Sequence, residues 1–285
     1  MPAATAMDGR ALAARVREDL KREIAEFGPV RLATVLVGDD PASHVYIRLK
    51  HKAADDVGIH AIDKRLPRST SEEELLVLIE ELNADDSVDG ILVQTPLPPQ
   101  IDEARVMRMI EPIKDVDGLH PFNAGQLFFG QETLVGATPV GVMRLLAEYK
   151  IPVAGARAVV VGRSLIVGRP LAMLLLHANA TVTICHSRTE DLTRHTLDAD
   201  ILVAAVGYLR LITADMVKTG AAVIDVGMNR TEEGLFGDVD PGVADVAGFL
   251  TPVPGGVGPM TIACLLENAL KAARYRSGAL AFPLI

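Results

Sequence analysis

A tyrosine and a lysine four residues apart, Tyr46 and Lys50, are the first residues whose types and spacing could support chemistry. Both lie in the stretch from Ala42 to Val57, where apolar residues recur every fourth position and predict a helix. The expected buried stripe consists of Val45, Leu49, Ala53 and Val57. Because residues four apart are neighbours on a helix, Tyr46 and Lys50 form a second stripe beside it. Burial there would lower the pKa of the ammonium and let it exchange a proton near neutral pH. The alternative is a structural lysine whose stem covers the core while its charge stays in solvent.

Three other segments carry residues in positions typical of ligand sites. Gln94 ends a predicted strand and precedes a proline-rich loop, at the edge of the sheet where α/β proteins bind ligands. Asp115 and Asp117 share a tight turn, and they either serve a ligand or merely cap that turn. The loop 251–259 holds three prolines and three glycines, which indicates a rigid path with close backbone approach.

A turn after the apolar run 158–160 is a candidate dinucleotide site. It contains Gly162 and Gly168 and leads into the apolar run 171–176, a predicted helix. In a βαβ unit, such a turn presents backbone N–H groups and the amino end of a helix to a phosphate. The usual Gly-x-Gly-x-x-Gly spacing is incomplete, so the turn is a weak motif by itself.

The residues after the next predicted strand, 181–186, indicate which dinucleotide would bind. Ser187 and Arg188 stand where an NAD site carries an acidic residue for the ribose hydroxyls. A guanidinium is permanently charged and suits a 2′-phosphate. We therefore expect NADP rather than NAD, with Arg163, Ser164, Ser187 and Arg188 around the adenosine phosphate. The alternative is that Arg188 is a solvated surface residue.

Strand-like and helical runs alternate along the chain, which predicts an α/β fold with two largely parallel sheets. The first set comprises strands at 32–37, 61–66 and 90–94, the helix 42–57 and a helix from Ser71. Glu74 completes a capping box with Ser71, and the expected apolar stripe of this helix is Leu75, Leu78, Ile79 and Leu82. The second set comprises strands from 158, at 181–186, at 199–206 and at 221–226, whose apolar character predicts burial on both faces.

The boundary between the two sets is expected in the weakly periodic segment 112–139, which a helix at 140–149 follows. At the other end of the second set, Gly258 and Pro259 stand where a helix cap and first turn are expected, and 260–273 is predicted to be one long helix.

Composition limits the class of protein. With 285 residues, of which 49% are hydrophobic, the chain can form a large core. The formal charge of −9, without a block of Lys and Arg, argues against a nucleic-acid or membrane partner. Two isolated cysteines and scattered histidines predict neither disulfides nor a metal site. No leader or long apolar run is visible, so a soluble, cytoplasmic protein is expected.

Taken in order, these motifs resemble the bifunctional methylenetetrahydrofolate dehydrogenase and methenyltetrahydrofolate cyclohydrolase family over nearly the whole chain. The segments that carry the resemblance are 8–13, 37–43, Tyr46-x-x-x-Lys50, 91–94, 114–118, 161–164, 185–189, 224–227 and 251–261. The resemblance implies a catalytic folate-binding domain at 1–137 and a Rossmann-type NADP-binding domain at 138–257. It also implies that the carboxyl-terminal helix, 258–285, packs back onto the first domain, that the active site lies in the interdomain cleft, and that the chain is a homodimer.

The resemblance also assigns roles to matching residues. Lys50 would be catalytic, Tyr46 would position the folate, Gln94 would tune the lysine and Asp117 would bond the pterin. Pro254 and Gly255 are expected to contact the folate. The expected NADP contacts are Gly162, Arg163, Ser164, Ser187, Arg188, Gly207, Met228 and Thr261.

The implied activity belongs to one-carbon metabolism. NADP would take a hydride from 5,10-methylenetetrahydrofolate, and water would then open the methenyl product to 10-formyltetrahydrofolate, with Lys50 and Gln94 moving the proton. This chain departs from the usual family residues at Thr95, Gln100, Ala137 and 208–211. Two other functions stay open. A dehydrogenase of a small hydroxy or amino acid would need a basic clamp for the substrate carboxylate, and a non-catalytic NADP-binding regulator would be indifferent to Lys50→Ala.

Overall fold

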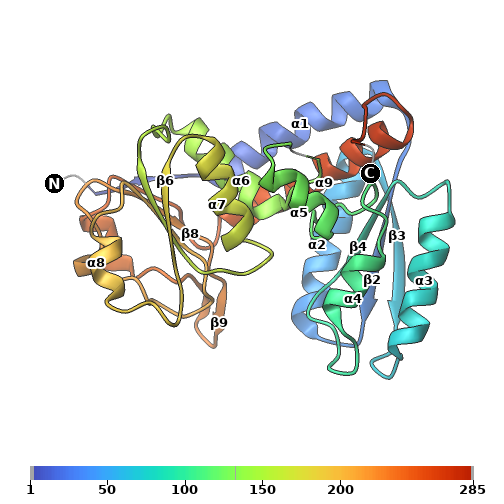
Figure 1. Ribbon diagram of the computed structural model, residues 1–285, viewed down its shortest axis with the longest axis horizontal. Helices are drawn as coiled ribbons and strands as arrows, with labels where there is room; N and C mark the ends of the chain where they lie inside the picture. Colours follow the sequence, from blue (N-terminus) through green and yellow to red (C-terminus); the bar gives the residue numbers. More distant parts are fainter. Residues whose placement is uncertain (1–2, 132, 284–285) are drawn as a thin grey trace. The chain divides into compact units, whose positions relative to one another are not determined.

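The computed structural model describes residues 3–131 and 133–283 and contains two compact units (Figure 1). The three-stranded unit comprises Arg15–Gly136 and the chain from Ile262 onward. The six-stranded unit comprises the chain up to Ala14 and Ala137–Thr261. Two helices, α1 (Gly9–Phe27) and α9 (Val257–Arg276), contribute residues to both units. Among the described residues, no helix is long and apolar enough to cross a membrane.

The two compact units and the predicted domain bounds both divide the chain near residue 137, and they differ for the chain up to Ala14 and for 258–261. The chain up to Ala14 belongs to the six-stranded unit, because β1 (Thr5–Ala6) pairs in parallel with β11 (Phe249–Leu250) of its sheet. Likewise, the division within α9 falls after Thr261. The assignment of a folate-binding domain to 1–137 with 258–285, and of an NADP-binding domain to 138–257, stays a prediction.

The three-stranded unit has a parallel sheet with the strand order β3-β2-β4. Its elements are β2 (Val30–Val37), α2 (Pro41–Val57), β3 (Ile59–Leu66), α3 (Glu72–Ala84), β4 (Gly90–Val93), α4 (Glu103–Met109) and α5 (Pro121–Phe128). The odd residues of β2, 33, 35 and 37, pack into the core formed by α3 and α4. On the other face, Thr34 Oγ1 lies 2.7 Å from His51 Nε2 of α2. The sheet is therefore covered on both sides, as Figure 1 shows for α2 and α3.

Local signals fix where the helices of this unit begin. Ser71 and Glu74 form the predicted capping box at the start of α3. Asp40 caps α2 by accepting from the backbone N–H of Ser43 at 2.8 Å, with Pro41 in the first turn. Gly58, at φ 89°, ends α2 in the left-handed region that glycine adopts without strain.

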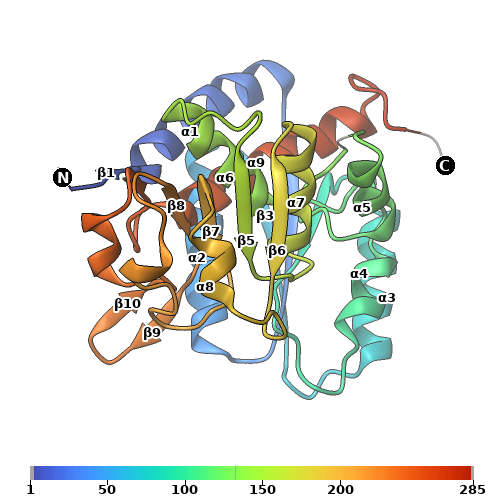
Figure 2. The ribbon, with the colours of Figure 1, turned by 60° about the vertical axis from the view of Figure 1, so that its left-hand side comes forward.

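The six-stranded unit has a parallel sheet with the order β1-β11-β8-β7-β5-β6. Its further elements are α6 (Ala137–Glu148), β5 (Arg157–Val161), α7 (Gly168–His177), β6 (Thr181–Cys185), α8 (Leu192–Thr196), β7 (Ile201–Ala204), β8 (Ala222–Asp225) and the hairpin β9 (Asn229–Thr231) with β10 (Gly234–Phe236). The chain leaves β5 for β6 on one side and returns to β7 on the other (Figure 2). Dinucleotides bind at such a reversal of strand order, beyond the carboxyl ends of the strands.

The structure corrects three details of the predicted burial. The strand β6 is not buried on both faces, because it is the edge of its sheet and Ile184 is 38% exposed. In α2, Leu49 is 45% exposed and Ile47 is buried instead, because the face against the sheet runs through 43, 47, 54 and 57. In α3, Leu76 is buried and Leu78 is only partly so. The helices α1, α4, α5 and α8 were not predicted.

Candidate active site

The three-stranded unit brings Lys50 and Gln94 into direct contact. Lys50 lies on α2, and its ammonium donates a hydrogen bond to Gln94 Oε1 at 3.0 Å. Gln94 follows β4, where its backbone N–H donates to Val35 O at 2.9 Å. Its side-chain amide donates to Thr95 O at 2.7 Å, so the amide nitrogen is occupied and the oxygen faces the lysine. The helix α2 and the loop after β4, which are distant in the sequence, thereby bring the Lys50 ammonium and the Gln94 oxygen together.

The third member of this group is Asp117, whose charge acts on Lys50. Burial lowers the pKa of Lys50, and the nearby negative charge of Asp117 opposes that shift. Burial raises the pKa of Asp117, and the positive charge of Lys50 opposes it in turn. An amine with a lowered pKa beside a carboxylate with a raised one is the arrangement expected where protons are exchanged.

The two aspartates of the predicted turn have different hydrogen-bonding environments. Asp115 is 1% exposed, and its Oδ2 accepts from the backbone N–H of His120 at 2.7 Å and from Asn123 Nδ2 at 3.0 Å. Burial raises the pKa of Asp115 to about 6. Among the described residues, none donates a hydrogen bond to the Asp117 carboxylate. The capping interpretation therefore holds for Asp115, whereas the ligand interpretation of Asp117 stays a prediction.

Two more residues singled out by the sequence analysis lie in the same unit. Tyr46 lies one turn before Lys50 on α2 and is partly buried, so the pair shares a helix face as its spacing predicts. Gln100 donates to Arg68 O at 2.7 Å and to Thr70 O at 3.0 Å, which ties the loop before α3 to the loop after β4. Gln100, which replaces the usual family residue at this position, thus has a structural role that the sequence did not indicate.

In the six-stranded unit, the turn after β5 touches the turn after β7. Gly162 has a φ of 128°, and a Cβ placed on it would come within 2.2 Å of Ala205 O. A Cβ on Gly168 would come equally close to Gly162 O, at 2.2 Å. Both positions therefore require glycine, and their close approach shapes the backbone at the strand reversal.

Ser164 and Arg163 lie in the same turn and are exposed. Ser164 Oγ accepts from the N–H groups of Val167 and Gly168, at 3.1 and 3.4 Å, so these first amides of α7 are already occupied. The hydroxyl proton of Ser164 is left to donate outward. A phosphate at this turn would therefore meet a hydroxyl and the Arg163 guanidinium rather than the bare helix end expected from sequence.

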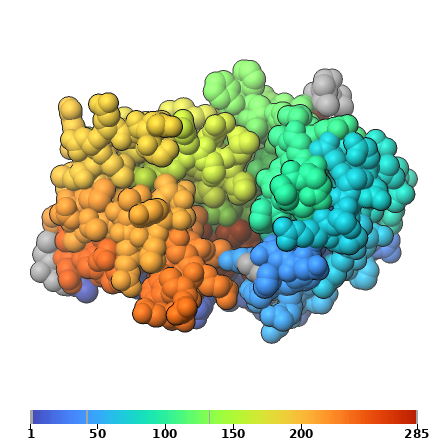
Figure 3. All heavy atoms as spheres, turned by 90° about the horizontal axis from the view of Figure 1, so that it is seen from below, coloured from blue at the N-terminus to red at the C-terminus, as the bar shows by residue number. Residues whose placement is uncertain are grey.

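Ser187 and Arg188 are exposed in the turn after β6. His186 holds this turn, since its N–H donates to Thr189 Oγ1 at 2.8 Å and its Nδ1 accepts from the N–H of Arg188 at 3.1 Å. In the space-filling view of Figure 3, gold and orange segments form much of this unit's surface, and they are the part of the chain that carries the turns after β6 and β7.

Two buried acids that the sequence analysis missed shape the loops after β7 and β8. Asp238 is fully buried and accepts from the N–H groups of Val206 and Gly207, at 2.7 and 2.9 Å, and from Asn229 Nδ2 at 2.9 Å. Asp225 accepts from three further backbone N–H groups, those of Gly227, Asp238 and Val239. Burial raises the pKa of Asp225 to about 6. The available signals were Asp225 at the end of an apolar run, two residues before Gly227, and Asp238 directly after Gly237.

The hydrogen bonds of these acids determine which groups of the predicted NADP contacts in the two loops are available to a ligand. The Gly207 N–H is taken by Asp238, so its amide is not free for a ligand. Met228 is 46% exposed and lies beside Gly227, where a Cβ would come within 2.2 Å of Asp238 Oδ1.

The Pro/Gly-rich loop packs on the start of α1. Gly255, at φ 119°, accepts from the Arg10 N–H at 3.1 Å, and a Cβ on Gly9 would come within 1.8 Å of Gly256 O. Pro254 is exposed. Thr261 Oγ1 lies 2.9 Å from Thr138 Oγ1, so its hydroxyl joins α9 to α6. Within 3–131 and 133–283, no group of three or more His, Cys, Asp and Glu residues could hold a metal ion.

Two family models match the chain in sequence order. The catalytic domain of tetrahydrofolate dehydrogenase/cyclohydrolase matches residues 7–117, and the NAD(P)-binding domain of the same family matches residues 136–277. The first range contains Lys50, Gln94 and Asp117, and the second contains every predicted NADP contact.

Known proteins agree over almost the full chain. The bifunctional protein FolD of Methanospirillum hungatei is 56% identical over 274 residues, which are 95% of this chain and 98% of that protein. The crystal structure of the bifunctional FolD enzyme of Campylobacter jejuni has a TM-score of 0.93 at 48% identity, covering 96% of this chain and 100% of that one. The Trypanosoma brucei enzyme, solved with NADP cofactor and an inhibitor, has a TM-score of 0.93 at 38% identity, covering 98% and 100%. The chain belongs to the bifunctional tetrahydrofolate dehydrogenase/cyclohydrolase family.

Proposed function

We propose that Lys50, Gln94 and Asp117 carry the folate chemistry of this chain. Family membership makes it an NADP-dependent methylenetetrahydrofolate dehydrogenase and a methenyltetrahydrofolate cyclohydrolase. The observation that supports these residue roles is the 3.0 Å contact between the Lys50 ammonium and Gln94 Oε1, with the charge of Asp117 acting on the same lysine.

Asp117 is the proposed anchor for the pterin ring. Its carboxylate receives no hydrogen bond from the described part of the chain, and carboxylates accept readily from ring N–H and amino groups. Tyr46, on the same helix face as Lys50, would hold the folate beside it. Pro254 and Gly255 are kept as proposed folate contacts on the family resemblance alone.

Lys50 is the proposed proton carrier of the hydrolysis. Water adds to the one-carbon bridge of the methenyl cation and forms a C–O bond while its proton passes to neutral Lys50 Nζ. The C–N5 bond then breaks, N5 takes a proton, and one proton is released overall. The lowered pKa of Lys50 makes the neutral amine available, and Gln94 Oε1 stabilises the ammonium that forms. A less cationic lysine also repels the cationic methenyl group less.

NADP fits the six-stranded unit, and when bound it accepts the hydride from the methylene bridge. The close turn at Gly162 lies at the strand reversal, and Arg163, Ser164, Ser187 and Arg188 offer guanidinium and hydroxyl donors there. We propose that these residues bind the phosphates of NADP, with Gly207, Met228 and Thr261 bordering the cofactor. Their direct contacts would come from groups that the hydrogen bonds described above leave available.

The chain is also proposed to act as a homodimer without a nucleic-acid or membrane partner. The family resemblance supports the dimer, and the net charge of −9 supports the absence of anionic macromolecular partners.

The test follows absorbance of the methenyl product after methylenetetrahydrofolate is mixed with enzyme and NADP, or with NAD. Wild-type protein should form the methenyl compound with NADP and then consume it. In Lys50→Met, which keeps the aliphatic stem, methenyl consumption should fall at least about a hundredfold. The matched control is Lys52→Met, an exposed lysine of the same helix, which should behave as wild type. Unchanged consumption in Lys50→Met would refute the role of Lys50.

A further inference from the structure

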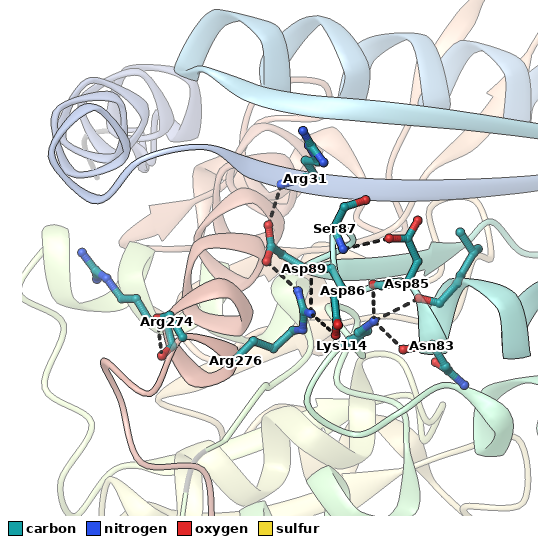
Figure 4. A network of polar contacts seen from close by, with 11 residues as sticks. Arg31, Asn83, Asp85, Asp86, Ser87, Asp89, Lys114, Arg274 and Arg276 are labelled. Atoms are coloured by element: carbon teal, nitrogen blue, oxygen red, sulfur yellow. Dashed lines mark hydrogen bonds and ion pairs between the residues drawn. The ribbon is translucent and has the colours of Figure 1, made fainter.

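A buried lysine outside the candidate active site closes the carboxyl end of α3, as Figure 4 shows. Lys114 is 2% exposed, and its ammonium donates to three backbone oxygens, those of Leu82, Asn83 and Asp85, at 3.0, 2.6 and 2.9 Å. The last carbonyls of a helix lack partners within the helix and form the negative end of its dipole. The cation therefore satisfies groups that would otherwise be left without donors.

The backbone of Lys114 is also tied to β4. Its carbonyl accepts from the N–H of Ile91 at 2.7 Å, and Asp115 lies opposite Ile91 in a parallel bridge. A Cβ on Gly90 would come within 2.4 Å of Val116 Cγ1, so the two stretches of chain are in close contact. The segment 114–118 thus runs beside β4 in one register.

This register decides where the folate residues meet. Gln94 lies three residues beyond Ile91, and Asp117 lies two residues beyond Asp115. Because the two stretches run parallel from their bridge, both side chains leave at the same edge of the sheet. There Gln94 contacts Lys50 and Asp117 acts on its charge. A shift of the segment along β4 would displace Asp117 relative to both partners.

We propose that Lys114 is a positioning residue for Asp117: by closing α3 it holds the segment 114–118 against β4 and sets where the Asp117 carboxylate meets the folate. The inference rests on the folate-binding role proposed for Asp117. The Lys114 ammonium contacts α3 and not Asp117, so its effect on Asp117 passes along the backbone of the segment.

The same network supplies a matched control. Arg276 of α9 holds the loop between α3 and β4, with Nη1 2.8 Å from Asp89 Oδ1 and Nη2 2.9 Å from Asp86 O (Figure 4). Asp89 Oδ2 in turn accepts from the N–H of Arg31 at 2.8 Å. Arg276 therefore stabilises this corner of the unit through Asp86 and Asp89, and within the described part of the chain the hydrogen bonds and ion pairs of its guanidinium go to these two residues. Its positive charge acts on Lys114 and helps to lower the pKa of that lysine, but its removal leaves the three Lys114 hydrogen bonds to α3 in place.

The experiment measures kcat, both KM values and the thermal midpoint for Lys114→Met and Arg276→Gln. We expect both variants to be less stable than wild type. Only Lys114→Met should raise the KM for methylenetetrahydrofolate, by at least about fivefold, with kcat within about twofold and the KM for NADP unchanged. An equal rise in Arg276→Gln would mean that general loosening is the cause, and it would overturn the proposal.

A double variant tests whether Lys114 acts through Asp117. In the Asp117→Asn background, Lys114→Met should add nothing further to the folate KM, because the positioned group is already lost. A full additional rise, or no rise in Lys114→Met alone, overturns the inference while leaving the role of Asp117 intact. If Asp117→Asn itself leaves the folate KM unchanged, the proposed function of Asp117 fails instead. Should Lys114→Met not fold, Lys114→Gln, which keeps an amide donor, takes its place with the same expected pattern.

Discussion

In both sheets of this chain, the strand order reverses at a strand that lies between the next two strands of the sequence. In the three-stranded unit β2 lies between β3 and β4, and in the six-stranded unit β5 lies between β6 and β7. The two proposed sites use residues that follow these strands, where α/β proteins bind ligands. The same topology has nevertheless produced two different kinds of site.

The difference lies in what the buried polar groups do. In the three-stranded unit, Lys50, Gln94 and Asp117 act on one another and keep capacity for a substrate. In the six-stranded unit, the carboxylates of Asp225 and Asp238 accept hydrogen bonds from backbone N–H groups of the protein. The side chains proposed to bind the phosphates of NADP there, those of Arg163, Ser164, Ser187 and Arg188, are exposed.

The comparison separates acids that hold loops in place by accepting backbone hydrogen bonds from an acid that is available for chemistry. An acid whose oxygens are filled by protein donors fixes loops, and it is costly to remove. An acid that lacks such donors contributes little to stability and is available to a ligand. Asp115 and Asp117 show the same division within one turn.

The largest expected effect comes from substituting one acid of each kind and comparing the two variants. Asp238→Ala should lower the free energy of unfolding by about 3 kcal/mol or more, because three donors lose their acceptor at about 1 kcal/mol or more each. Asp117→Asn should change it by less than about 1 kcal/mol and yet lower kcat/KM for the folate at least about tenfold. Urea denaturation and steady-state kinetics on both variants measure the two quantities.

The comparison would break if Asp117→Asn were as destabilising as Asp238→Ala. Asp19→Asn, which changes an exposed acid of α1, serves as the neutral reference for both measurements.

The second effect is a pH dependence of stability that belongs to Asp115. An aspartate titrates near pH 3.9 in an unfolded chain, whereas the pKa of Asp115 in the folded protein is about 6. Between these values the folded state holds a proton that the unfolded state has lost. The contribution of Asp115 to stability is therefore highest at low pH, falls as pH rises through about 4 to 6, and is constant above.

The variant Asp115→Asn keeps an acceptor oxygen for His120 and Asn123 but does not ionise. Its free energy of unfolding, relative to wild type, should therefore rise by about 2 kcal/mol from pH 4 to pH 7. Urea denaturation at four pH values in this range measures the difference. A constant difference across the range would show that Asp115 ionises normally in the folded state.

Sequence patterns predicted the elements whose cause is local. The capping box at Ser71 and the Tyr46–Lys50 helix face follow from residue spacing, and the structure has both. The alternation of strands and helices predicted the α/β class, which the two parallel sheets confirm.

The missed features depend on which strand pairs with which. The exposure of β6 follows from its edge position, which its apolar sequence does not reveal. Asp225 and Asp238 lie 13 residues apart, and only the fold turns them into a joint acceptor set for two loops. Lys114 belonged to a recognised motif, but its partners at the end of α3 are about 30 residues earlier, beyond the reach of a local pattern.

The smallest expected effect tests the exposed side of the comparison. Arg188 is exposed, and its N–H is held by His186, so its guanidinium can be removed without disturbing the turn. Arg188→Ala should lower kcat/KM for NADP by about tenfold, the cost of one charge-assisted contact to a phosphate. The thermal midpoint and kcat/KM for NAD should stay as in wild type, because NAD lacks the 2′-phosphate. Steady-state kinetics with the two cofactors measure the ratio, with Arg194→Ala, on α8, as the matched control. An equal loss with NAD would mean that Arg188 shapes the turn. Arg188 would then act like Asp225 and Asp238, which fix the backbone of loops, and not as a direct contact to the 2′-phosphate.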